Sequence, residues 1–178
     1  MAKLTEERIS GGLVYAGKFF ELHKDTVRLP DGTQATREYV RHPGAVAVVA
    51  LTEEGAVVLE RQHRYPLRQD FVEIPAGKVD AGEERLACAQ RELLEETGYA
   101  AADWRRLGQI HNAIGYSDES IEIWLAKGLE KRDAKLDAGE FLEVFTLPIA
   151  EALAMTTDGR ITDAKTIVGL FWAQHFLR

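Results

Sequence analysis

The chain has 178 residues, 46% of them hydrophobic, so it can bury a substantial core in one compact domain with a small appendage. Its formal net charge of -7 argues against general binding to nucleic acid or to an anionic membrane. It has no apolar run of membrane-spanning length, no hydrophobic signal core, and one cysteine, Cys88, which excludes an intrachain disulfide. These features predict a soluble, cytoplasmic protein that needs metal ions or arginines to bind an anionic substrate.

The N-terminal part is expected to form a small antiparallel meander with strands over residues 13–15, 19–27 and 33–40. Pro30, Asp31 and Gly32 form a strong hairpin signal between the last two strands. Three strands of this length bury too little apolar surface to be stable alone, so the meander should pack on the main domain or on a second subunit. We therefore predict a meander domain over residues 1–42 and a main domain over residues 43–178.

The main domain is expected to begin with an apolar strand over residues 45–51, after the break at His42, Pro43 and Gly44. Further strands are predicted at residues 56–62, 71–75, 105–111, 121–127 and 143–147, and helices at residues 149–155 and 163–176. Thr162 or Asp163 is the expected cap of the last helix. Strands and helices mixed in this order predict an α/β sandwich.

A further helix is expected over residues 84–97, which lack Gly and Pro, with Gly98 ending it in a left-handed conformation. Glu92 and Glu96 lie four residues apart and Glu95 lies three from Glu92, so these carboxylates converge on one face. A hard divalent cation, Mg²⁺ or Mn²⁺, would relieve their mutual repulsion. The alternative is a charged helix face that only contacts solvent.

The remaining residues of this helix complete the pattern. Leu86, Ala89 and Leu93 mark a second face that is suited to the core. Cys88 is expected to be a buried, small apolar residue rather than a reactive thiol. Arg91 is the one cation of the helix placed to offset the carboxylates, four residues before Glu95.

The segment from Gly77 to Tyr99 reads GKVDAGEERLACAQRELLEETGY. It fits the Nudix box G-x5-E-x7-R-E-U-x-E-E-x-G-U, where U is aliphatic, at every fixed position except Tyr99. The matching residues are Gly77, Glu83, Arg91, Glu92, Leu93, Glu95, Glu96 and Gly98. Eight matches in a loop-helix frame favour a metal site over a solvent-facing helix. The chain resembles Nudix hydrolases, which implies a mixed sheet between helices with the box as loop-helix-loop.

Segments outside the box resemble the ADP-ribose pyrophosphatase branch of that family, over most of residues 34–178. They are RQHRY at residues 61–65, EIPAG at residues 73–77, and residues 111–129 and 159–173. The resemblance implies a Mg²⁺-dependent homodimer, paired through its N-terminal domain, that cleaves ADP-ribose to AMP and ribose 5-phosphate. Ile114 stands where the branch usually has a proline that would fix a loop, which admits GDP-mannose or another nucleoside-diphosphate sugar instead. A nucleotide-binding module without turnover is a rival that the intact box disfavours.

The metal site is predicted at the box. Glu92 and Glu96 are the expected principal ligands, Glu95 serves a further ion or its water, and Glu83 is a metal-linked carboxylate. The resemblance adds the backbone carbonyl of Ala76 as a ligand. Arg91 is counted among the catalytic residues and is expected to orient a glutamate by ion pairing rather than to touch substrate.

The general base is left open between two glutamates. The resemblance places it in an acidic loop after the box, matched here by LDAGEFLEV, which contains Asp137, Glu140 and Glu143. Registering this text against the family strand gives Glu140 the position of a glutamate that binds metal or deprotonates water. Glu95 of the box is the other candidate.

Substrate contacts are predicted at two places. Arg61, His63 and Arg64 form a cationic cluster, and Arg64 registers with an arginine that binds a substrate phosphate in the branch; a solvated basic turn is the alternative. In the meander, REYV resembles the branch's text near the nucleobase. Its residues Arg37 and Glu38 either contact substrate or form a cross-strand ion pair. Phe20, with Phe19 and Tyr39, offers an aromatic face for a base or belongs to the core or an interface.

Overall fold

The computed structural model describes residues 4–134, 136, 139 and 141–176. The chain forms two compact units. The first runs to Gly44 and includes His111–Glu119, and the second comprises Ala45–Ile110 and the chain from Ser120 onward. The predicted domains, residues 1–42 and 43–178, follow the chain without the excursion of His111–Glu119, and that division stays a prediction.

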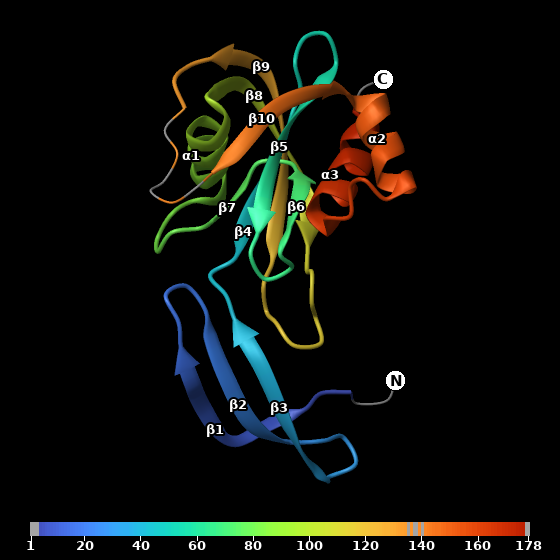
Figure 1. Cartoon of the computed structure of the whole chain (residues 1–178). Coiled ribbons are helices and arrows are strands. Elements are labelled where there is room, and N and C mark those ends of the chain that lie inside the picture. The colour runs from blue at the N-terminus through green and yellow to red at the C-terminus, as the bar shows by residue number, and fades with distance from the viewer. Residues whose placement is uncertain (1–3, 135, 137–138, 140, 177–178) are drawn as a thin grey trace. The chain divides into compact units, whose positions relative to one another are not determined.

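The first unit is built on an antiparallel sheet with the strand order β1-β2-β3 (Figure 1). Its strands are β1 (Glu7–Ala16), β2 (Glu21–Arg28) and β3 (Gln34–Arg41). In the predicted turn, the Thr33 amide donates 2.9 Å to the Asp31 carboxylate, which closes the hairpin locally. β1 begins earlier than predicted. The prediction missed its first residues because nearly all residues of β1 are exposed and its ends carry no alternating apolar pattern.

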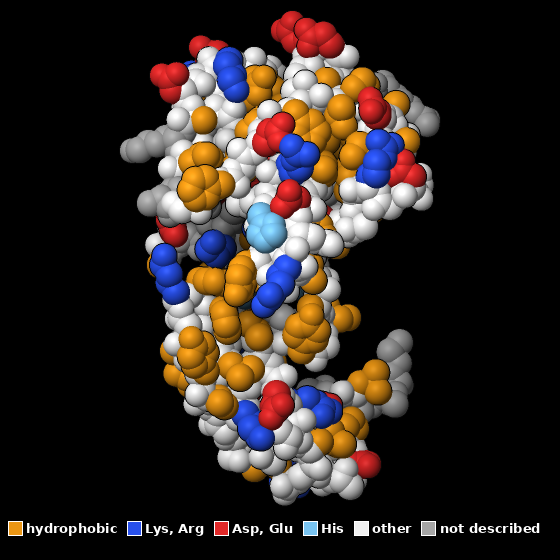
Figure 2. Space-filling view, viewed as in Figure 1, with side chains coloured by type: hydrophobic (Ala, Val, Ile, Leu, Met, Phe, Trp, Pro, Cys, Tyr) orange, Lys and Arg blue, Asp and Glu red, His pale blue; other side chains and the backbone are white. Residues whose placement is uncertain are grey.

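Exposed hydrophobic residues are numerous on this first sheet. Leu13, Val14, Tyr15 and Phe19 are each at least half exposed, and Figure 2 shows hydrophobic side chains at the surface of this part of the chain among charged ones. The segment His111–Glu119 lies along β3, where the Val40 amide donates 2.8 Å to the Tyr116 carbonyl. It covers part of the edge that β3 would otherwise expose.

The second unit contains seven strands and three helices among its described residues. They are β4 (Ala45–Ala50), β5 (Ala56–Arg64), β6 (Gln69–Glu73), β7 (Ala76–Lys78), α1 (Arg85–Thr97), β8 (Tyr99–Ile110), β9 (Ile121–Lys131), β10 (Leu142–Pro148), α2 (Ile149–Asp158) and α3 (Ala164–Gln174). One sheet has the order β7-β4-β9-β8, with β4 and β9 parallel and the other pairs antiparallel; a second has the antiparallel order β10-β5-β6.

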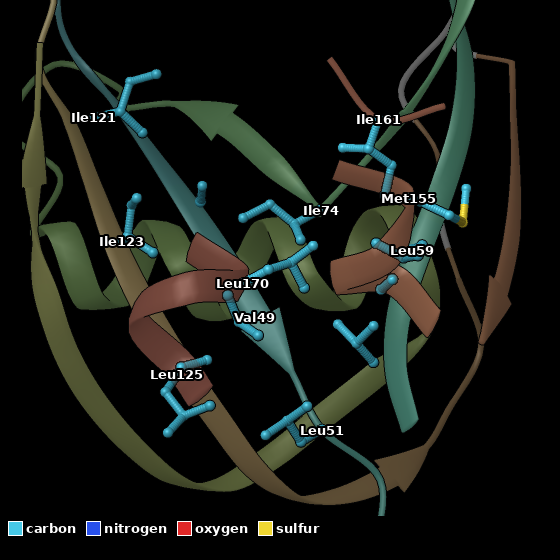
Figure 3. Close-up of a cluster of buried hydrophobic side chains, with 14 of the residues drawn as sticks. Val49, Leu51, Leu59, Ile74, Ile121, Ile123, Leu125, Met155, Ile161 and Leu170 are labelled. Atoms are coloured by element: carbon cyan, nitrogen blue, oxygen red, sulfur yellow. The ribbon is translucent and has the colours of Figure 1, made fainter. Parts of the chain in front are cut away.

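The core is organised by β4, which is buried on both faces. Val46 and Val48 pack with Cys88 and Leu93 of α1. Residues that alternate with them, such as Val49, pack with α2 and α3, and Figure 3 shows Val49 beside Leu170 of α3 among the buried side chains. Figure 1 accordingly shows α1 on one side of the strands and α2 and α3 on the other. The predicted α/β sandwich with a mixed sheet is confirmed.

One predicted core residue of α1 is not buried. Leu86 is exposed, whereas Ala89 and Leu93 are fully buried and Cys88 joins them. Leu86 lies in the first turn of the helix, and periodicity does not show how far along a helix its neighbours extend. Within the described parts of the chain, no helix has the length and apolar character needed to cross a membrane.

Candidate active site

The box helix begins and ends where the sequence predicts. α1 starts after Glu84 and ends at Gly98, whose φ of 69° is left-handed and whose amide donates 2.9 Å to the Leu94 carbonyl. Gly82, in the loop before the helix, also has a positive φ, of 80°. These two turns set the position of α1 relative to β7, and with it the position of the box glutamates.

One pocket of the second unit brings much of the predicted site together. It is lined by residues of β5, β7, the loop after β7 and α1: Gln62, Arg64, Ala76, Gly77, Lys78, Asp80, Arg91, Glu92 and Glu96. Its volume of about 160 Å³ is below that of pockets that enclose a drug-sized ligand, about 300–1,000 Å³. Arginine side chains and carboxylates therefore face the same small space.

The two predicted principal metal ligands lie directly against β7. Glu96, which is only 5% exposed, accepts a 3.0 Å hydrogen bond from the Ala76 amide. A Cβ atom at Gly77 would lie 1.8 Å from Cδ of Glu92, so the carboxylate can occupy this place only because residue 77 is glycine. The structure thus places Glu92 and Glu96 beside the Ala76–Gly77 backbone.

Arg91 connects the other carboxylates of the box. Its Nε and Nη2 atoms each donate 2.9 Å to Glu83, and its Nη1 donates 2.8 Å to Glu92 and 3.0 Å to Glu95. The hydrogen bond from Arg91 lowers the pKa of Glu83 to about 2, and the bond to Glu83 raises the pKa of Arg91. These are ion pairs of the kind that the orienting interpretation of Arg91 requires, and its catalytic role stays a prediction.

Arg64 lines the same pocket from β5 and is held by Glu73 of β6. Its Nε and Nη2 donate 2.7 and 2.8 Å to the two carboxylate oxygens of Glu73. This bidentate hydrogen bond raises the pKa of Arg64. Burial opposes ionisation of Glu73, but its bonds to Arg64 and Lys165 outweigh that and hold its pKa below the ordinary value. A guanidinium has five N–H donors, of which Glu73 uses two.

The other members of the predicted cationic cluster do not line this pocket. Arg61 pairs with Glu143, its register partner on β10, and His63 contacts Asp70 at 2.9 Å on β6. Both pairs are largely exposed, as expected for a solvated basic turn. The predicted substrate contact of Arg61 is therefore separate from the pocket in this structure, whereas that of Arg64 lies in it.

The predicted contacts in the meander lie in the first unit. Arg37 donates 2.9 Å to Glu6, and Glu38 forms the cross-strand ion pair with Lys24 at 3.0 Å. Both residues line one shallow hollow of this unit. Phe20 packs against Phe19 with ring centroids 5.2 Å apart, beside a second hollow. Their roles toward a substrate stay predictions.

One of the two candidate bases lies outside the described residues, and the other is paired with Arg91. Glu140, like Asp137, lies outside the described residues, while Glu143 lies in β10 as expected. Glu95, the other candidate, pairs with Arg91 and does not line the pocket.

Four side chains at or beside the pocket were absent from the prediction: Gln62, Lys78, Asp80 and Glu73. The two-residue period of a strand supplies a signal for Gln62, because it puts Gln62 and the buried Glu60 on the same face as Arg64. Lys78 and Asp80 fall at variable positions of the box, so the pattern carries no signal for them.

The pocket suits a hard divalent cation. Glu92 and Glu96 offer carboxylate oxygens beside the backbone of residues 76–77, and oxygen donors are what Mg²⁺ and Mn²⁺ prefer. In the described portion of the chain, no three His, Cys, Asp or Glu side chains are already arranged as a metal cluster. The remaining ligands would come from backbone, water or substrate, as is usual for Mg²⁺.

Comparison with known families decides the assignment. The profile of the NUDIX domain matches residues 41–168. This chain belongs to the Nudix family. Residues 6–40 match the nucleoside diphosphate sugar hydrolase N-terminal domain. The predicted family and enzyme class are confirmed, and Nudix hydrolases generally need a divalent metal ion.

Individual relatives cover nearly the whole chain. It is 42% identical over 177 residues to the methanol dehydrogenase activator of Bacillus methanolicus, covering 98% of this chain and 96% of the relative. It is 40% identical over 178 residues to the ADP-ribose pyrophosphatase of Bacillus subtilis, covering 98% and 95%. A GDP-mannose pyrophosphatase of Yersinia pestis is 35% identical over 173 residues, covering 89% and 87%. The crystal structure of an ADP compounds hydrolase shares the fold, with a TM-score of 0.86 at 22% identity over 98% and 96%.

Proposed function

We propose that this Nudix hydrolase cleaves ADP-ribose to AMP and ribose 5-phosphate, with Mg²⁺ or Mn²⁺ as its metal ion. The observation that carries the proposal is the pocket in which Arg64 faces the same space as Glu92 and Glu96. A cation that binds phosphate and carboxylates that bind metal are the two requirements of a diphosphate site. The similarity to a pyrophosphatase of ADP-ribose at 40% identity supports this substrate.

The chemistry follows from charge. Hydrolysis of a diphosphate places additional negative charge on its oxygens in the transition state, and groups fixed beforehand stabilise that charge best. A bound metal ion supplies Lewis-acid stabilisation of several kcal/mol. Glu92, Glu96 and the Ala76 carbonyl would hold it, with Glu95 and Glu83 linked to it directly or through water. Arg64 binds a phosphate group, and Arg91 keeps the carboxylates in place.

The size of the pocket limits how much of the substrate it holds. A volume of about 160 Å³ accommodates the diphosphate and its metal. A whole nucleotide sugar needs a pocket in the usual range for drug-sized ligands, about 300–1,000 Å³. The nucleoside and the sugar are therefore bound by other residues. Arg37, Glu38, Phe20 and Arg61 are our candidates for that task.

We assign the activation of water to Glu140 and keep Glu95 as the alternative. Support for Glu140 is its register position in the acidic loop before β10. Glu95 carries a weaker claim, because it already pairs with Arg91 at 3.0 Å.

We further propose a cytoplasmic homodimer that forms through the N-terminal sheet and binds neither nucleic acid nor membranes. Leu13, Val14 and Tyr15 of β1 are each more than half exposed in the single chain, and a second copy would cover them. Light scattering at micromolar concentration should give twice the mass of one chain. A fully active monomer at that concentration would refute the homodimer as the active form.

The direct test is a panel of diphosphates incubated with Mg²⁺ and scored by product identity. We expect ADP-ribose to be hydrolysed fastest, with AMP and ribose 5-phosphate in equal amounts. GDP-mannose is the closest alternative, because Ile114 replaces a loop proline and a GDP-mannose pyrophosphatase is among the relatives. Glu96→Gln is the control for contaminating activity. Binding of ADP-ribose without turnover would favour the binding module and reject the enzyme.

The 42% identity to a methanol dehydrogenase activator supports a second candidate function. Sequence identity does not separate it from the first, since the ADP-ribose pyrophosphatase of Bacillus subtilis is 40% identical. Adding the protein to a purified methanol dehydrogenase and measuring methanol oxidation tests it. The Glu96→Gln variant shows whether any activation needs the box.

A further inference from the structure

The segment that leads into the box is held by the first turn of α3. Lys165 donates a hydrogen bond from Nζ to Oε2 of Glu73, at the end of β6. One residue further, the Ile74 amide donates 2.9 Å to Oγ1 of Thr166. Two consecutive residues before the box are thus fixed by two consecutive residues of one helix.

Asp163 completes this arrangement from the cap position of α3. Its Oδ2 accepts from the Thr166 amide at 3.0 Å, from the Thr166 hydroxyl at 2.6 Å and from Lys165 Nζ at 3.0 Å. The helix cap requires only the bond from the amide. The hydrogen bond from Lys165 is not part of this cap, and the same ammonium group also bonds to Glu73.

Lys165, Glu73 and Thr166 lie in the interior of the protein. Lys165 is 8% exposed, Glu73 is 2% exposed and Thr166 is fully buried. Removing a charge from water is costly unless it is paired and hydrogen-bonded, and an apolar residue at such a place is often no less stabilising. A buried lysine between two carboxylates is therefore weak support for stability, and one of those carboxylates, Glu73, also pairs with Arg64.

Glu73 is shared between two cations. Arg64 approaches it with two hydrogen bonds, of 2.7 and 2.8 Å, while Lys165 bonds to the same carboxylate from α3. Arg64 also lines the pocket with Glu92 and Glu96, whereas neither Lys165 nor Glu73 does. Among the described residues, the ion pairs of Glu73 connect Lys165 to the pocket through Arg64.

We infer that Lys165 is a positioning residue for Arg64, which it prepares to bind the diphosphate by sharing the carboxylate of Glu73. Without Lys165, the negative charge of Glu73 would fall on Arg64 alone and cancel more of the charge that Arg64 presents to a phosphate. The carboxylate would also lose its second anchor and with it the fixed orientation of the guanidinium. The inference rests on the proposed function in that a diphosphate is taken as the ligand of Arg64.

The first experiment measures binding without turnover. The probe is α,β-methylene ADP, whose diphosphate bridge cannot be hydrolysed, titrated calorimetrically with Mg²⁺ into wild type and Lys165→Met. We expect Kd to rise about tenfold, the size of one hydrogen bond to a charged group. Arg160→Met is the matched control, because Arg160 precedes α3 and its ion pair with Asp158 is exposed; its Kd should equal that of wild type.

The second experiment separates positioning from a general structural effect. Lys165→Arg, which keeps the charge, should restore most of the affinity. In an Arg64→Ala background, Lys165→Met should change Kd by less than about twofold, because the residue through which it acts is gone. If Lys165→Met does not fold, Lys165→Gln, which keeps an N–H donor without the charge, replaces it throughout.

The steady-state kinetics of the best substrate complete the test. Lys165→Met should raise KM about tenfold and change kcat by less than about threefold. An unchanged Kd, an equal loss in the Arg64→Ala background, or a wild type that does not bind the probe would each overturn the inference. A wild type that binds the probe but hydrolyses no diphosphate would overturn the proposed function alone.

Discussion

Two ion-pair networks meet at the pocket, and they differ in their balance of charge. At α1 one cation, Arg91, is shared by the three carboxylates of Glu83, Glu92 and Glu95. At β6 the carboxylate of Glu73 is shared by Arg64 and Lys165, and Lys165 also pairs with Asp163. The first network has carboxylate charge in excess, which suits a metal ion. In the second, two carboxylates face two cations, and Arg64 keeps N–H donors beyond the two that Glu73 uses, which suits a phosphate.

An acidic protein of net charge -7 can still offer a place suited to an anion. It does so locally, by placing a shared carboxylate behind an arginine and excess carboxylates where a metal ion offsets them. The carboxylates of the two networks also differ in burial. Glu73 is nearly inaccessible, whereas Glu95 remains about one-third exposed. The proposed phosphate-binding residue Arg64 is thus held by Glu73, and the proposed metal-binding carboxylates are held by Arg91.

The largest effect is expected at Glu140, which we propose as the residue that activates water. Glu140→Gln should lower kcat about a hundred- to ten-thousandfold with little change in KM, the range for loss of general-base catalysis. Asp137→Asn, from the same acidic segment of the sequence, and Glu143→Gln, in β10, are the matched controls and should do less. A Glu140 variant no slower than these two would move the base to Glu95, and kcat for all three decides it.

The proposed metal ligands come next. Glu96→Gln should lower kcat on the order of a hundredfold or more, since a lost ligand removes several kcal/mol of charge stabilisation. Circular dichroism should show an intact fold, and Glu130→Gln, at an exposed ion pair of β9, is the control. Near-wild-type turnover of a folded Glu96→Gln protein would refute the metal assignment.

A steric test addresses the same carboxylates without removing one. Gly77→Ala puts a methyl group where Cδ of Glu92 lies, 1.8 Å away, so the carboxylate must move. We expect kcat to fall about ten- to a hundredfold, because displacements near 1 Å have effects of that size. The control is Gly115→Ala, where nothing lies within 4 Å. Equal activity of the two variants would show that Glu92 is not held at β7 for catalysis.

Much of this arrangement can be predicted from the sequence because it depends on contacts between residues that are close in the chain. The box spacing within α1, the glycine after the helix and the Asp163 cap depend on neighbours a few residues away, and all three agree with the structure. The alternation of Val46 and Val48 with Ala47 and Val49 also follows from a single strand.

The contacts that were not predicted join distant segments. Lys165 and Glu73 are 92 residues apart in the chain, and Arg61 and Glu143 are 82 apart. No spacing rule connects such positions, since their contact depends on how the strands and helices pack. The same limit explains Leu86, whose exposure depends on where α1 extends past its neighbours.

The smallest predicted effect concerns acid stability at the Arg91 network. The folded pKa of Glu83 is lowered from 4.5 to about 2, chiefly by its hydrogen bond with Arg91. A depressed carboxylate pKa contributes stability that is complete above pH 4.5 and is lost as pH falls toward 2. The gap in unfolding free energy between wild type and Glu83→Gln should therefore be constant at neutral pH and narrow below pH 4.5.

Urea unfolding at pH 7, 4.5 and 3 measures this gap. A chelator is present so that metal does not compete for the carboxylates. In an Arg91→Met background the gap should nearly vanish, because the partner that lowers the pKa is gone. A gap that persists unchanged at pH 3 would show that Arg91 holds Glu83 by contacts other than its charge.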